Sequence, residues 1–137
     1  MSKTSWIFLS DSPKIIKLTQ NNSKLVVGFI EEITSKEHGA DMVNIARIHL
    51  DDNVIPLHHH KNHQETYLCI TGVGQLFLND DVMDFQPGDR VIIQPNVIHS
   101  IRPKKLSGQM GLVELLCICA PAFDPDDEYI DPRGTNW

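Results

Sequence analysis

Short apolar segments with alternating polar positions dominate the chain after residue 25. These segments are rich in β-branched residues and are separated by Gly, Pro, Asn and Asp, a pattern typical of β-strands. Strands are expected over residues 24–34, 41–50, 65–71, 73–79, 90–94 and 111–120. No stretch shows the capped 3.6-residue apolar stripe that predicts a helix. Many short strands at this spacing indicate an all-β sandwich or barrel.

The chain is expected to form one domain over residues 1–137. Its length is typical of a single domain, and no internal repeat or linker interrupts it. The barrel core is placed at about residues 26–120, between irregular N- and C-terminal segments. The tail, residues 121–137, is rich in proline and acidic residues. It is expected to lie over the barrel surface, anchored by Phe123, Tyr129 or Trp137.

Composition narrows the class of protein. Hydrophobic residues make up 41% and charged residues 22% of the chain, which is typical of a soluble globular protein. The formal net charge of −6 argues against a nucleic-acid partner, because phosphate binding requires a basic face. No apolar run approaches the ~20 residues that span a bilayer and no signal peptide is evident, so no membrane partner and a cytoplasmic location are expected.

The three cysteines are an odd number, so they cannot form a self-contained disulfide framework. Cys117 and Cys119 stand two positions apart, on one face of the strand expected over residues 111–120. The pair is interpreted as small buried apolar side chains in preference to metal ligands.

Four histidines fall within six positions of the run "HHHKNHQETY", residues 58–67. On a strand, His58 and His60 point one way, about 6.6 Å apart along the chain, and His59 points the other way. A turn then leads to Glu65, which is expected to open an antiparallel strand across from the histidine pair. Two histidines and one carboxylate form the facial arrangement of non-haem iron and related metal sites.

The spacing of these residues resembles the first motif of the cupin family, G-x5-H-x-H-x3,4-E-x6-G. Here Asp52 is followed after five residues by His58-x-His60, after four more by Glu65 and after six more by Gly72. Asp52 stands where the motif has glycine. Aspartate tolerates the left-handed backbone that glycine serves there, so the turn can survive.

A second segment resembles the second cupin motif, G-x5-P-x-G-x2-H-x3-N. Gly88 is followed after five residues by Gln94-Pro95-Asn96, and His99 lies two residues beyond Asn96. Gln94 replaces the motif proline, Asn96 replaces the glycine and Pro103 replaces the final asparagine. None of these positions supplies a metal ligand in the family, and Asn96 tolerates a left-handed backbone as Asp52 does.

The resemblance, which covers about residues 42–103, implies a small jelly-roll β-barrel with a metal ion in its mouth. The implied ligands are His58, His60, Glu65 and His99. One divalent transition metal per chain is expected, and this ligand set does not choose among iron, manganese, nickel and zinc. The alternative is an empty polar pocket, as in cupins that have lost their metal.

By resemblance, the function is that of a metal-dependent dioxygenase, isomerase or lyase acting on a small polar substrate, either sugar-like or an oxo acid. Tyr67 shares the inward face of Glu65 and is the candidate acid or base, with packing as the other interpretation. The alternative function is a non-catalytic binding or sensor cupin, in which the metal is structural or holds a ligand.

The remaining polar residues near the motifs are assigned to less specific roles. His59 is expected at the surface, and His63 is interpreted as a plain loop residue in preference to a substitute ligand or proton carrier. Arg47 and His49 share one face of their strand. They are either exposed or line the pocket, and exposure is favoured.

Two of the expected strands, "ETYLCIT" and "VELLCICA", are apolar on both faces. A strand that is covered on one side alternates instead. The N-terminal segment, the tail or another subunit must therefore cover the outer face. Small cupins are commonly dimers, so a homodimer is expected.

Overall fold

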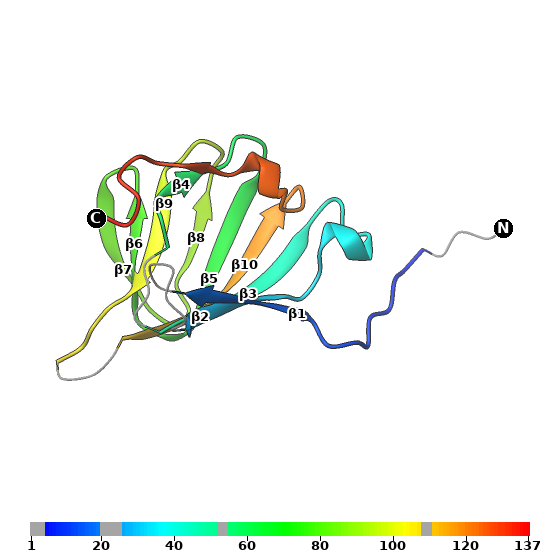
Figure 1. Cartoon of the computed structure of the whole chain (residues 1–137), viewed down its shortest axis with the longest axis horizontal. Coiled ribbons are helices and arrows are strands. Elements are labelled where there is room, and N and C mark those ends of the chain that lie inside the picture. The colour runs from blue at the N-terminus through cyan, green and yellow to red at the C-terminus, as the bar shows by residue number, and fades with distance from the viewer. Residues whose placement is uncertain (1–4, 20–25, 52–54, 108–110) are drawn as a thin grey trace.

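Two antiparallel β-sheets face each other across one core (Figure 1). The computed structural model describes residues 5–19, 26–51, 55–107 and 111–137. The first sheet has the order β1 (Lys14–Thr19), β2 (Val26–Glu32), β3 (Asn44–Asp51), β10 (Leu112–Ala120), β5 (Gln64–Gly72) and β8 (Arg90–Ile93). The second has the order β11 (Tyr129–Ile130), β4 (His58–His59), β9 (His99–Pro103), β6 (Gly74–Leu78) and β7 (Asp81–Phe85). Two single turns of 3₁₀-helix, η1 (Lys36–His38) and η2 (Pro125–Asp127), complete the described elements.

The strand order is that of a jelly roll. The pairs β3–β10 and β5–β8 lie in one sheet, and the pairs β4–β9 and β6–β7 lie in the other. Successive strands from β3 to β6 therefore cross from sheet to sheet and enclose a shared interior. The expected all-β jelly-roll fold is confirmed.

The core follows from period-2 alternation along the strands. On β10, Val113, Leu115, Cys117 and Cys119 are buried while the residues between them are more exposed. Side chains from the facing sheet fill the other half of the core. Among them, Ile101 on β9 has no exposed surface. This alternation points the inward residues of both sheets at one another, including the polar ones.

The six expected strands are present as β2, β3, β5, β6, β8 and β10, and the strand that His99 was expected to begin is β9. Three strands were not expected. The strands β1 and β11 pair only at sheet edges, and the first four side chains of β7 are exposed, so none of them carries a strong burial pattern. The tight turn before β7 is a two-residue hairpin loop in which Asn79 and Asp80 both adopt positive φ.

The turn before β9 explains one departure from the cupin motif. Asn96 adopts φ +71°, the left-handed conformation that the motif glycine would supply. Gly88 likewise adopts φ +91°. The corresponding expectation for Asp52 lies outside the described residues.

The tail crosses the end of the two sheets near β4 (Figure 1). All three expected anchors are in contact with the body. Phe123 packs against the core, Tyr129 stacks on His59 with ring centroids 5.1 Å apart, and the Trp137 ring lies 5.5 Å from that of Phe77. Within the described residues, no helix is long and apolar enough to cross a membrane.

Arg47 and His49 point away from the interior, but they are half-buried, so the favoured interpretation of exposure is met only in part. The Arg47 guanidinium forms ion pairs with Glu31 and Glu114, and His49 stacks on Phe29 with ring centroids 4.8 Å apart. Neither residue lines the interior cavity.

Candidate metal centre

Four buried polar side chains converge between the two sheets. His58 on β4 and His99 on β9 are direct cross-strand partners, His60 follows β4, and Glu65 lies on β5 of the facing sheet. One ligand atom from each of the four lies within 4.8 Å of those from the other three, and all four residues are buried. The structure thus brings together every residue that the motifs nominated as a ligand.

Glu65 reaches this cluster by a different route from the one expected. It was predicted to lie across from the histidines on a neighbouring antiparallel strand, which is wrong, because β5 pairs with β10 and β8 in the other sheet. The carboxylate approaches the histidines through the interior instead. Strand alternation correctly predicted that the Glu65 side chain points into the interior. Local spacing could not predict which of the two sheets contains its strand.

Backbone carbonyls orient all three imidazoles in the same way. Nδ1 of His58, His60 and His99 lies 2.7, 2.7 and 2.8 Å from the carbonyl oxygens of Pro56, Asp127 and Val97 respectively. A carbonyl oxygen can only accept a hydrogen bond, so each Nδ1 carries the proton. Each Nε2 is then free to direct a lone pair into the cluster, which is the tautomer that second contacts impose on metal-binding histidines.

The atoms that face one another in the cluster require a cation between them. Glu65 Oε1 lies 2.8 Å from His60 Nε2 and 3.1 Å from His99 Nε2, and in the neutral tautomer all three atoms are acceptors. Either a proton or a metal ion can resolve this arrangement. Two atoms bonded at right angles to an ion at ~2.1 Å lie ~3.0 Å apart, so the observed separations fit a bound metal.

The electrostatics of the cluster favour a charged carboxylate beside a neutral His58. Burial alone would raise the pKa of Glu65, but hydrogen bonds from His60 and His99 outweigh it and hold that pKa well below its usual range. Burial and the neighbouring His99 lower the pKa of His58 to about 4. Near neutral pH, His58 is therefore uncharged and available as a ligand.

The second oxygen of Glu65 is held by a thiol. Cys117 Sγ donates to Glu65 Oε2 at 3.0 Å, while Cys119 Sγ lies 3.8 Å from the same oxygen. The hydrogen bond with Cys119 and burial raise the pKa of Cys117 well above its usual value, which keeps the thiol protonated as a donor. The cysteines are small buried residues as expected, and one of them also orients the carboxylate so that Oε1 faces the histidines.

Replacing Cys117 with Ala should weaken metal binding by about 10–100-fold, the usual effect of removing a partner that orients a ligand. Cys117→Ser keeps a donor and should recover most of the affinity. Cys119→Ala, which removes a thiol at the longer distance, serves as the control. The measurement is a competitive titration with a chromophoric chelator, and equal affinities for Cys117→Ala and Cys119→Ala would contradict the orienting role.

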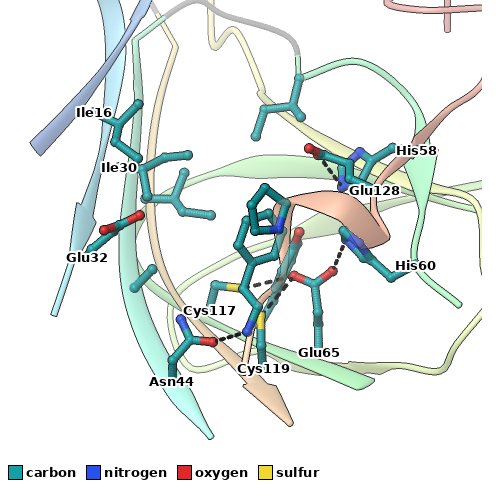
Figure 2. Close-up of a pocket in the computed structure, with 16 residues that line it drawn as sticks. Ile16, Ile30, Glu32, Asn44, His58, His60, Glu65, Cys117, Cys119 and Glu128 are labelled. Carbon is teal, nitrogen blue, oxygen red and sulfur yellow. Dashed lines mark hydrogen bonds and ion pairs between the residues drawn. The ribbon is translucent and has the colours of Figure 1, made fainter. Parts of the chain in front are cut away.

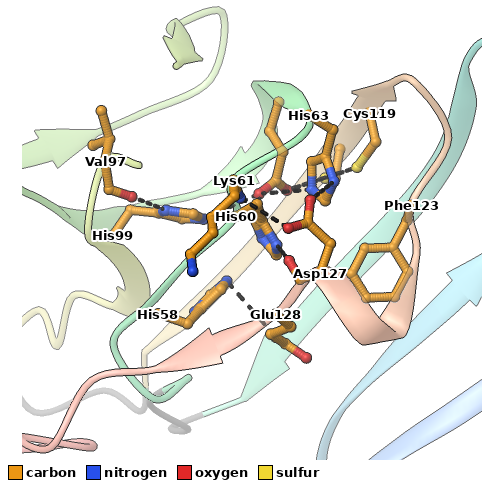
Figure 3. A network of polar contacts seen from close by, with 12 residues as sticks. His58, His60, Lys61, His63, Val97, His99, Cys119, Phe123, Asp127 and Glu128 are labelled. Atoms are coloured by element: carbon orange, nitrogen blue, oxygen red, sulfur yellow. Dashed lines mark hydrogen bonds and ion pairs between the residues drawn. The ribbon is translucent and has the colours of Figure 1, made fainter. Parts of the chain in front are cut away.

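His63 is buried, so its interpretation as a plain loop residue is wrong. It lies between β4 and β5 with 3% of its surface exposed, and its Nδ1 is 3.3 Å from Asp127 Oδ2 (Figure 3). Its Nε2 has no hydrogen-bond partner among the described residues. Its ring centroid is 4.0 Å from that of His60, and its Nε2 is 3.9 Å from Glu65 Oε1, so the ring stands at the edge of the ligand cluster.

Asp127 is the important residue that sequence reasoning missed. Its carboxylate accepts hydrogen bonds from the backbone N–H groups of Lys61 and Asn62, and its carbonyl accepts from His60. It thereby fixes the turn after the histidine run. Asp127 lies in η2 of the acidic tail, a single turn too short for a periodic pattern to distinguish a buried aspartate from its exposed neighbours.

A cavity of about 300 Å³ opens beside the cluster (Figure 2). Its polar lining includes His58, His60, Glu65 and Asn44, and most of the remaining wall is apolar. The apolar lining residues are Ile16, Ile30, Ala46, Ile48, Ile55, Phe123 and Pro125. A pocket with apolar walls and a few converging polar groups is typical of a small-molecule site.

Tyr67 lies on the inward face of β5, two residues beyond Glu65, and lines this cavity. Its ring centroid is 6.1 Å from that of His99, in an edge-on orientation. Burial and the nearby Glu65 raise the pKa of Tyr67 well above its usual value, so the phenol keeps its proton at neutral pH. His59, by contrast, points away from the cluster and is partly covered by Tyr129.

Comparison with known proteins agrees with this geometry. Residues 45–107 match the cupin domain family. An uncharacterized protein of Aquifex aeolicus is 27% identical over 117 residues, which cover 85% of this chain and 92% of that protein. A crystal structure from Planctomyces limnophilus superposes with a TM-score of 0.70 and 18% identity over 92% of this chain and 98% of that one. The nucleoside dehydratase Pac13 superposes with a TM-score of 0.65 and 15% identity over 98% and 100% of the two chains; structures of the Streptomyces protein contain uridine.

Proposed function

We propose that the interior of this chain, whose residues 45–107 match the cupin domain family, holds one divalent transition metal ion and that the protein is a metal-dependent enzyme acting on a small polar molecule. His58, His60, Glu65 and His99 are the proposed ligands. The observation that carries the proposal is the common orientation of the three histidines: each Nδ1 donates to a backbone carbonyl, and one ligand atom from each histidine and from Glu65 converges within 4.8 Å of the others.

The chemistry follows from four ligands and an adjoining cavity. A bound divalent ion would act there as a Lewis acid on a substrate oxygen. The chain itself would supply apolar walls that exclude water from the substrate, and the Tyr67 hydroxyl as a proton donor at the cavity surface. This combination supports a dioxygenase, isomerase or lyase, and the fold alone does not choose among them.

The test is conversion of a panel of sugars, nucleosides and oxo acids, followed by mass spectrometry with metal-loaded and chelated protein in parallel. We expect product only with the loaded protein, and none from His60→Ala after the same treatment with metal. Conversion that survives chelation would contradict the proposal. Saturable ligand binding by the loaded protein without product would favour the alternative of a non-catalytic binding or sensor cupin.

We also propose a homodimer, based on the outer face of the six-stranded sheet. Leu116 and Leu68 are adjacent there, and Ile70 and Ile92 are 42% and 61% exposed. Among the described residues, neither β1 nor the tail covers this face, because β1 extends the sheet at β2 and the tail pairs with β4. Burial of such a surface between two copies removes apolar area from water.

Light scattering should therefore give twice the chain mass of 15.5 kDa at micromolar concentration. Ile92→Lys places an unpaired charge on this face and should shift the protein toward the monomer. Met42→Lys, at an 85% exposed position outside the strands, should leave the mass unchanged. A wild-type mass of 15.5 kDa would overturn the dimer.

A further inference from the structure

The cavity carries acidic side chains at two places beyond the metal centre. Glu32 lies at the end of β2 beside Ile16 and Ile30, and Glu128 lies beside His58, as Figure 2 shows. Glu32 comes from β2 of the six-stranded sheet and Glu128 from the tail between η2 and β11, so the two carboxylates approach the cavity from different sides. Glu128 Oε1 is 3.9 Å from His58 Nε2, so this charge stands directly next to the cluster.

No lysine or arginine lines the cavity among the residues that the structure describes. Lys14 stands across from Glu32 in the register of β1 and β2 without lining the cavity, and two basic residues that neighbour lining residues in the sequence are engaged elsewhere. Arg47 pairs with Glu31 and Glu114 on the outer face, and Lys61 lies over the Tyr129 ring at 4.2 Å. A carboxylate or phosphate on a ligand would therefore find no side-chain cation in this wall to offset its charge.

The formal charges decide which ligands the cavity favours. A divalent ion with three neutral imidazoles and Glu65 leaves one positive charge, and Glu32 with Glu128 reverses it to one negative charge. The apolar walls strengthen these interactions relative to bulk water, and water screens the charge of Glu128 more strongly, because its side chain is 38% exposed. A ligand with an additional anionic group is repelled, whereas a hydroxyl is tolerated and an ammonium is attracted.

We propose that this cavity selects small ligands that bind the metal through oxygen, carry a short apolar body, and end in a neutral or cationic group. This inference rests on the proposed metal centre and narrows its substrate class. Of the two classes suggested by the cupin resemblance, neutral sugar-like molecules fit, and oxo acids with a second free carboxylate do not. Amine-bearing molecules, which the resemblance did not suggest, also fit. Glu32 and Glu128 are the residues that set this preference.

Three hydroxamates that share one metal-binding head and a three-carbon chain test the proposal. Butanohydroxamic acid ends in a methyl group, 4-aminobutanohydroxamic acid in an ammonium, and glutaric acid monohydroxamate in a carboxylate. Each is titrated calorimetrically into the Zn²⁺-loaded protein at constant pH and ionic strength. Each affinity is normalised to that of the same compound for free Zn²⁺.

We expect the ammonium compound to bind at least about tenfold more tightly than the carboxylate compound, with the affinity of the methyl compound between the two. We call the ratio of the ammonium compound's affinity to that of the carboxylate compound the spread. In the double variant Glu32→Gln/Glu128→Gln this spread should fall below about threefold. Glu37→Gln, which removes an exposed carboxylate in η1 that does not line the cavity, should keep the full spread.

Equal or tighter binding of the carboxylate compound by the wild-type protein would overturn the inference. A spread that persists in the double variant would overturn the assignment to Glu32 and Glu128. If none of the three compounds binds the Zn²⁺-treated protein, the metal centre itself is refuted, and the inference falls with it. These results are distinct, so failure of the selectivity is separable from failure of the proposed function.

Discussion

Replacing His60 with Ala should strip most of the metal from the protein. The substitution removes one of four converging ligand atoms and also the group that donates to the Asp127 carbonyl. Affinity should fall by more than the ~10–100-fold typical of losing an orienting partner. His99→Ala should have the same effect, although it lies 39 positions further along the chain, because the fold brings both residues to Glu65 Oε1.

The matched control is His59→Ala, because His59 is adjacent in sequence and points the other way. It loses only a stacking contact with Tyr129, which costs ~0.5–1.5 kcal/mol of folding free energy, and should keep full metal content. His60→Gln retains most of the side-chain volume. If this variant loses the metal as His60→Ala does, misfolding around a cavity is excluded as the cause. Metal loss in His59→Ala together with full occupancy in His60→Ala would show that the strand register is wrong by one residue.

Replacing Tyr67 with Phe should reduce turnover by ~10²–10⁴-fold, the range for loss of a general acid or base. The substitution removes one hydroxyl from the cavity wall and keeps the buried ring against His99. Metal content and melting temperature should not change. The measurement is the steady-state rate on a substrate found by the conversion screen, with kcat and KM determined separately.

Tyr129→Phe is the control, because it removes the hydroxyl of the other tyrosine in the chain, which does not line the cavity. Its turnover should equal that of the wild type. If Tyr67→Phe also matches the wild type, Tyr67 only packs against the centre. A lower turnover that is accompanied by lost metal would point to a structural role instead.

The ligand set could be predicted from sequence because it depends on local geometry. Alternation along a strand separates His58 and His60 from His59, and the two motifs fix Glu65 and His99 by spacing. The left-handed conformation of Asn96 was also predictable, since it follows from one residue's steric tolerance. The structure adds what local patterns lack, namely that Glu65 belongs to the facing sheet.

The surroundings of the site could not be predicted in the same way. Asp127 and Glu128 reach the cluster from an irregular tail, where position is set by long-range packing and no period marks the inward residues. The burial of His63 depends on that tail as well, because Asp127 lies against it. The orienting thiol of Cys117 was recognised as buried, but its contact with Glu65 joins residues 52 positions apart.

Elemental analysis of the purified protein tests the metal centre most directly. The predicted result is about one divalent transition metal ion per chain, with a fall in melting temperature after chelation. At a free metal concentration 100 times the Kd, binding contributes ~2.7 kcal/mol to stability, which corresponds to several degrees for a domain of this size. Less than about a tenth of an equivalent after refilling with iron, manganese, nickel and zinc in turn would contradict the account.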